Sequence, residues 1–187
     1  YLEWWQAAGC AVLALLHNRY LLARYASRLF REGESGWKSG VVRYPLAVLG
    51  IILASEIIAR GDWDEDYARF AMPLWAILAF GDPVAAFVGR WAGGPPPPWN
   101  PKKTWSGSAA FVLAAFAASL AAIYAHHGFR YSWDWTPDWD LLLLPAVLSL
   151  ACAYVESLDL GADDNLTVPI TATLLFWFVE AIPSWIS

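Results

Sequence analysis

Long blocks of apolar residues alternate with short polar segments along almost the whole chain. Each block approaches the roughly 20 residues that a helix needs to cross a bilayer. We therefore predict six transmembrane helices, from apolar blocks over residues 4–16, 41–59, 70–88, 106–125, 141–158 and 166–186. The first block is long enough only if its helix continues to Leu22. The pattern predicts an all-α, polytopic membrane bundle that forms a single domain over residues 1–187.

The composition supports a membrane protein. The chain is 58% hydrophobic, with only 12 Lys+Arg and 17 Asp+Glu, whereas a soluble domain of this size needs more surface charge. Many of the 13 Trp and 8 Tyr residues lie near block ends, as in the aromatic belts of membrane interfaces. The net charge of −5 gives no support to a nucleic-acid partner.

Basic residues are concentrated in two of the loops between the predicted spans. Residues 19–32 combine arginines at helical spacing with an apolar face, which predicts an amphipathic helix lying on the membrane surface. The loop between the third and fourth spans carries Arg90, Lys102 and Lys103. By the positive-inside rule, both basic loops face the cytoplasm, and so does the acidic loop that holds Asp163 and Asp164. All candidate chemical groups then lie on one side.

Asp82 stands inside the third apolar block. An ionisable residue within a membrane segment is costly and therefore indicates function. Asp is a favoured helix N-cap, and proline fits the first turn of a helix better than its interior. We therefore predict that the third helix breaks at Gly81 and that a half-helix begins at Pro83, beside a buried or watery cavity. The alternative is a proline-kinked helix in which Asp82 merely caps.

Two further polar clusters border the spans. Residues 102–108 combine lysines, hydroxyls and glycine at the start of the fourth helix, where backbone N–H groups can bind an anion. Taken alone, this cluster is better explained as a basic flank with a serine cap. Glu156 closes the fifth span and Asp163, Asp164 and Asn165 open the sixth. Converging carboxylates favour Mg²⁺ or Ca²⁺, although Asp164 or Asn165 could simply cap a helix.

The three clusters together supply what phosphoryl transfer requires, without the P-loop or Gly-rich loop of soluble kinases. In their order and spacing they resemble the membrane family of CTP-dependent lipid kinases, which includes phytol kinase, dolichol kinase and the CTP-using diacylglycerol kinase. The resemblance is greatest to the phytol kinase branch and covers residues 41–173. Its motifs are residues 81–82, 89–90, 103–104, 107–108, 156–158 and 163–169.

The resemblance implies phosphorylation of a membrane lipid alcohol, such as phytol or a polyprenol, with CTP as phosphate donor and Mg²⁺ as cofactor. It implies catalytic roles for Asp82, Glu156 and Lys103, with Asp82 or Glu156 accepting the alcohol proton. Implied Mg²⁺ ligands are Asp82, Asp163 and Asp164. Implied nucleotide-binding residues are Gly81, Gly89, Arg90, Lys102, Thr104, Ser106, Gly107, Ser108 and Asn165. Because many members are longer, the lipid pocket is either incomplete in this chain or formed by a homodimer.

Two other classes of protein fit parts of the pattern. A CDP-lipid synthase also uses CTP and Mg²⁺ at a membrane, but the signature of the phosphatidate cytidylyltransferases is not found in the sequence. A non-enzymatic transporter could use Asp82 and a broken helix as its binding site. No inverted repeat is visible among the six predicted spans.

Overall fold

The structure, a computed structural model of the chain, describes residues 3–22, 39–60, 67–130, 139–158, 160 and 164–186. For residues 129–130, 139–141, 164 and 180–186 it describes the backbone only. This part of the chain contains six α-helices and one π-helical segment, and no strand occurs within it. The all-α prediction is confirmed.

The elements are α1 (Trp4–Leu16), η1 (His17–Leu22), α3 (Gly40–Ala59), α4 (Tyr67–Ala92), α5 (Trp105–Arg130), α6 (Trp139–Ser157) and α7 (Asp164–Ile186). Three helical segments, Gly40–Ala59, Tyr67–Ala92 and Trp105–Gly128, are long and apolar enough to cross a membrane. The apolar segments in α6 and α7 are shorter. The π-helix η1 extends α1 to Leu22, as predicted. Beyond Leu22, the predicted amphipathic helix over residues 19–32 lies outside the described residues.

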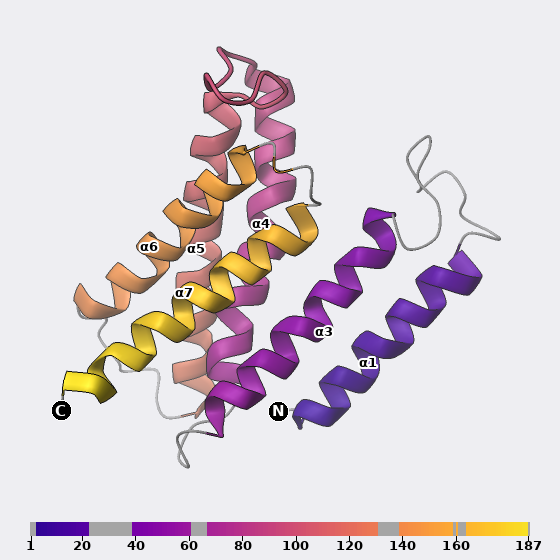
Figure 1. The fold of residues 1–187 in the computed structure, drawn as a ribbon, viewed down its shortest axis with the longest axis vertical. Coiled ribbons are helices and arrows are strands. Elements are labelled where there is room, and N and C mark those ends of the chain that lie inside the picture. The colour runs from indigo at the N-terminus through magenta and orange to yellow at the C-terminus, as the bar shows by residue number, and fades with distance from the viewer. Residues whose placement is uncertain are drawn as a thin grey trace.

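The helices form a bundle in which α4 and α5 lie side by side (Figure 1). Helices α6 and α7 pack on this pair, α3 contacts α4 and α7, and α1 covers α3. The core is built from apolar side chains of α3 to α7, including the fully buried Leu74, Phe111 and Leu148. The N-termini of α3, α5 and α7 lie at the same end of the bundle as the C-termini of α4 and α6 (Figure 1). Residues 102–108 and 156–158 of the predicted polar clusters border these termini, whereas Asp82 lies within α4, ten residues before its end at Ala92.

Small residues let α4 and α5 approach closely. Gly81, Ala85 and Gly89 recur every four residues along one face of α4. A Cβ at Gly81 would lie 2.7 Å from the Phe111 ring, and one at Gly107 would lie 3.1 Å from the Ala85 carbonyl oxygen. Such spacing of small residues is typical of closely packed transmembrane helices. It holds the α4–α5 pair together along the half of α4 that leads to the polar end.

The predicted break at Gly81 is wrong, because α4 is one helix from Tyr67 to Ala92 that contains both Pro73 and Pro83. Transmembrane helices tolerate proline where neighbouring helices and local adjustments satisfy the freed backbone groups. Here, the packing of Gly81 against Phe111 supports α4 next to the proline. Asp82 is therefore a half-buried residue within a continuous helix and caps no half-helix.

Candidate functional site

The α4–α5 loop, residues 93–104, is anchored at both of its ends. Gly93 and Gly94 have φ of 61° and 117°, a region that favours glycine, and they turn the chain at the end of α4. The Gly93 N–H donates to the Gly89 carbonyl oxygen at 3.2 Å. At the other end, the Trp105 N–H donates to the Pro95 carbonyl oxygen at 3.2 Å. Residues 93–104 thus form a folded loop whose two ends are fixed by backbone hydrogen bonds.

Two loop residues attach this loop to the last turn of α6. The Trp99 indole Nε1 donates to Ser157 Oγ at 3.0 Å, and Asn100 Nδ2 donates to the Ser157 carbonyl oxygen at 3.1 Å. Asn100 Oδ1 also accepts the Lys102 N–H at 3.0 Å. Asn100 is only 2% exposed and satisfies a carbonyl at the helix end. The sequence reasoning missed Asn100; its only signal was the preference of Asn for turns.

Lys103 and Glu156 form an ion pair between this loop and α6. Lys103 Nζ donates to Glu156 Oε1. The Glu156 side chain is 4% exposed and that of Lys103 is 26% exposed. A carboxylate buried to this degree needs a charged or hydrogen-bonding partner, and Lys103 supplies it. The structure thus brings together a residue from each of the two clusters that border the fourth and fifth predicted spans.

The N-terminus of α5 is a capped helix start. Thr104 is its N-cap, since Thr104 Oγ1 accepts the Gly107 N–H at 3.1 Å. Ser106 Oγ donates to the Gly93 carbonyl oxygen. Ser108 Oγ, by contrast, is buried and has no hydrogen-bond partner. Of the three predicted hydroxyls, that of Ser108 is therefore the one without a hydrogen-bond partner among the described residues.

The predicted glycines and exposed cations have different surroundings. A Cβ at Gly89 would lie 2.9 Å from Thr104 Oγ1, so Gly89, like Gly81 and Gly107, has a packing reason to be glycine. Arg90 and Lys102 are exposed, in the last turn of α4 and in the following loop. Contact of these five residues with phosphate stays a prediction.

The N-terminus of α7 lies against that of α3. Asn165 Nδ2 is 3.3 Å from the position of a Cβ at Gly40, the first residue of α3. Next to Gly40, the buried N-cap Ser39 makes no side-chain capping bond, and its hydroxyl has no hydrogen-bond partner. Ser39 was not singled out in the sequence, because an N-cap serine is unremarkable there. Two helix N-termini therefore meet beside Asn165.

The predicted Mg²⁺ ligands are only partly described. Asp163 and the side chain of Asp164 lie outside the described residues, and no three His, Cys, Asp or Glu side chains converge among those that are described. Mg²⁺ in phosphoryl-transfer sites is commonly held by one or two protein carboxylates together with substrate phosphates. A single carboxylate such as Asp82 therefore has suitable donor chemistry for this ion.

Curated proteins similar to this chain are named as kinases of phytol or farnesol. The chain is 34% identical over 150 residues to phytol kinase 1, chloroplastic, of Arabidopsis thaliana, covering 78% of this chain and 45% of that protein. It is 37% identical over 107 residues to probable phytol kinase 2, chloroplastic, of Oryza sativa subsp. japonica, covering 56% and 34%. It is 38% identical over 99 residues to farnesol kinase, chloroplastic, of Arabidopsis thaliana, covering 52% and 31%.

The chain spans less than half the length of these three relatives. No protein-family profile matches the chain, and no solved structure matches it. The three relatives agree with one another, since each is named as a kinase of phytol or farnesol. Over the segment that it shares with them, the chain resembles the phytol kinase branch of the membrane lipid-kinase family.

Proposed function

We propose that this protein phosphorylates an isoprenoid lipid alcohol, transferring the γ-phosphate of CTP in the presence of Mg²⁺ at the cytoplasmic boundary of the membrane. The observation that carries the proposal is the Lys103–Glu156 ion pair. It holds a cation at the bundle end where the N-termini of α3, α5 and α7 lie (Figure 1). Positive charge and helix N-termini are what a nucleotide triphosphate requires.

Lys103 is the proposed phosphate-binding cation. An ammonium group can donate three hydrogen bonds, so Lys103 can remain paired with Glu156 while it contacts a phosphate oxygen. Glu156 is nearly buried and bonded to Lys103. We therefore assign Glu156 a positioning role and leave the acceptance of the alcohol proton to Asp82.

Asp82 is the proposed general base. In the transfer, the alcohol oxygen attacks the γ-phosphorus, the bond to the β–γ bridging oxygen breaks, and the hydroxyl proton passes to the Asp82 carboxylate while CDP leaves. Mg²⁺, when bound, would neutralise phosphate charge, and Asp163 and Asp164 would supply carboxylate oxygens of the kind that it prefers, which leaves the Asp82 carboxylate to accept the proton. This role agrees with the half-buried position of Asp82 within a membrane-spanning helix.

The remaining phosphate contacts are assigned to the same end of the bundle. Ser108 has a buried hydroxyl without a protein partner, and Asn165 lies where α3 and α7 begin. Arg90 and Lys102 are exposed cations at the edge of this region. A phosphate chain bound here would face the N-terminus of α5, whose dipole favours negative charge.

The test incubates purified protein in detergent with Mg²⁺, a panel of lipid alcohols and γ-labelled CTP, UTP or ATP. We expect a labelled lipid monophosphate from CTP, and no transfer by a folded Asp82→Asn variant. An active Asp82→Asn protein contradicts the role of Asp82. Pyrophosphate together with a nucleotide-linked lipid would instead identify a CDP-lipid synthase, and solute flux independent of nucleotide would identify a transporter.

A further inference from the structure

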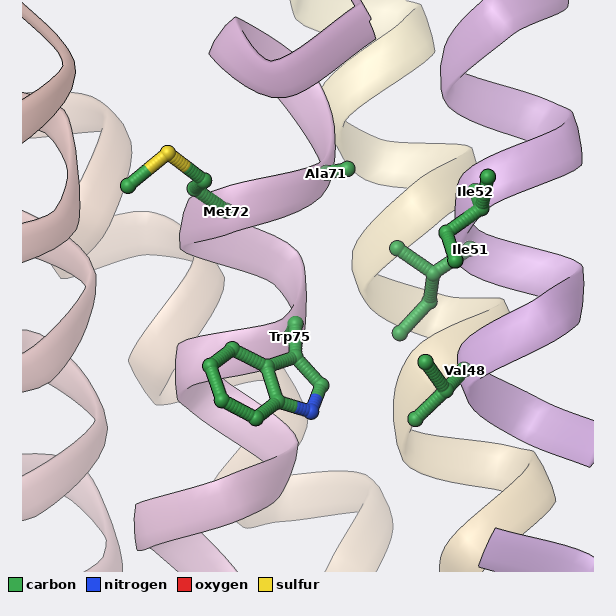
Figure 2. A pocket seen from close by; sticks show the side chains of 6 residues that line it. All are labelled: Val48, Ile51, Ile52, Ala71, Met72 and Trp75. Carbon is green, nitrogen blue, oxygen red and sulfur yellow. The ribbon is translucent and has the colours of Figure 1, made fainter. Parts of the chain in front are cut away.

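An apolar pocket lies between α3 and α4, away from the polar end of the bundle. Its volume is about 150 Å³, and it is lined by Val48, Ile51, Ile52, Ala71, Met72 and Trp75 (Figure 2). The lining exposes apolar atoms only, so the pocket suits a hydrocarbon group better than a polar one. Trp75 is 46% exposed, so the pocket opens at the surface of the bundle.

The pocket and Asp82 lie along the same face of α4. Trp75 and Asp82 are seven residues apart, so two helical turns and a rise of about 10 Å separate them, with a rotation of only about 20°. Because α4 is continuous through this stretch, no break disturbs that alignment. The part of the pocket nearest to Asp82 is therefore at Trp75. From there the pocket extends along α4 to Ala71, which lies further than Trp75 from the polar end of the bundle.

The polar atoms next to the pocket satisfy each other. Trp75 Nε1 donates to Tyr44 Oη at 3.1 Å, across the gap between α4 and α3. This bond engages the only polar side-chain atom among the six lining residues. A hydrocarbon chain can thus enter without leaving a buried indole N–H unpaired.

We propose that this pocket binds the hydrocarbon chain of the isoprenoid alcohol whose hydroxyl is at Asp82. The proposal rests on the proposed function, and it adds the position of the chain and a determinant of chain length. A branched isoprenoid chain has the apolar chemistry of the lining, and its length spans the two turns between Asp82 and Trp75. An alcohol too short to reach Trp75 gains nothing from the pocket.

The first test compares two bulky substitutions on α3. Val48→Phe fills the pocket, whereas Leu53→Phe adds the same ring at an exposed position on the same helix that does not line the pocket. We expect Val48→Phe to lower kcat/KM for farnesol about tenfold, as expected for the loss of roughly two buried methylene groups, and to leave dimethylallyl alcohol unaffected. Equal effects of the two variants, or an equal loss for both alcohols, would overturn the proposal.

The second test does not depend on turnover. A farnesol analogue with a diazirine in its chain is photolysed with the protein, and the labelled peptides are mapped. We expect labelling of residues 71–75 that excess farnesol competes away and that Val48→Phe abolishes. Labelling competed equally well by phospholipid, or spread evenly over α3 and α4, would overturn chain binding here. Absence of phosphorylation with pocket labelling intact would instead reject the proposed function.

Discussion

Lys103 and Glu156 are 53 residues apart in the sequence, and their ion pair joins the α4–α5 loop to the end of α6. Removal of one partner takes away the ion pair of a buried carboxylate or of its lysine, and breaking a buried ion pair in this way typically costs about 3–5 kcal/mol. We predict that Lys103→Ala and Glu156→Ala each lower the free energy of unfolding by about this amount or slightly less, because Lys103 is partly exposed. Denaturant titration in detergent measures the effect.

The matched control for this pair is a double variant. Replacing a buried ion pair by apolar residues of similar volume is often neutral for stability. Lys103→Met combined with Glu156→Met is therefore expected to recover most of the lost stability while phosphoryl transfer stays absent. A double variant that loses as much stability as the two single variants added together would show that Lys103 and Glu156 stabilise the protein independently of their ion pair.

Asn100 holds the α4–α5 loop on the last turn of α6. Asn100→Ala removes the side-chain amide that bonds the buried Ser157 carbonyl, and an unsatisfied buried group costs about 1–3 kcal/mol. We expect a loss of stability in this range and a fall in kcat, because Lys103 loses its fixed position. Unfolding titrations and steady-state kinetics measure the two effects.

Trp99→Phe is the control for Asn100, since it removes only the indole hydrogen bond to Ser157 Oγ and keeps an aromatic ring beside Trp105. The expected loss of stability is about 0.5–1.5 kcal/mol, with kcat nearly unchanged. If Trp99→Phe and Asn100→Ala lower kcat equally, Asn100 does not position Lys103.

Much of the helical architecture could be predicted from the sequence, because the bilayer restricts apolar blocks to a narrow range of lengths. Helices α3 to α7 each begin within one turn of the predicted start. The break at Gly81 was a wrong prediction, because the local preferences of Asp and Pro do not include the contact between Gly81 and Phe111. Helix α5 also runs past His126 to Arg130, beyond its predicted end at residue 125.

The charged residues of the candidate site could be singled out from the sequence, but the residues that they contact could not. Lys103 and Glu156 both stood out as ionisable residues at the ends of apolar blocks. Their pairing depends on how residues 93–104 fold back over α6, which no local pattern encodes. Asn100 was missed because its bonds exist only once the loop meets Ser157.

Substitution of Gly81 tests whether the close packing of α4 on α5 is required for the stability of the protein. Gly81→Ala places a Cβ 2.7 Å from the Phe111 ring, and such overpacking typically costs about 1–3 kcal/mol. Gly50→Ala on α3 is the control, because no atom lies within 4 Å of its added Cβ. That change is expected to be neutral or to stabilise by up to about 1 kcal/mol. Thermal unfolding in detergent compares the two, and equal shifts would contradict tight α4–α5 packing.

Substitution of Ser108 distinguishes an effect on nucleotide binding from an effect on the free energy of unfolding. Its buried hydroxyl has no protein partner, so Ser108→Ala is expected to leave the free energy of unfolding unchanged or slightly higher. Loss of a hydrogen bond to a charged phosphate costs about 1.5–3 kcal/mol, which raises the KM for the nucleotide about tenfold to a hundredfold.

Ser149→Ala is the matched control for Ser108. Ser149 Oγ is buried in α6 and donates to the Pro145 carbonyl oxygen at 2.6 Å, so its removal is expected to lower stability by about 0.5–1.5 kcal/mol without changing the nucleotide KM. Unfolding titrations and nucleotide kinetics on both variants give the comparison. A Ser108→Ala protein with reduced stability and an unchanged KM would assign Ser108 to the fold and remove it from the phosphate site.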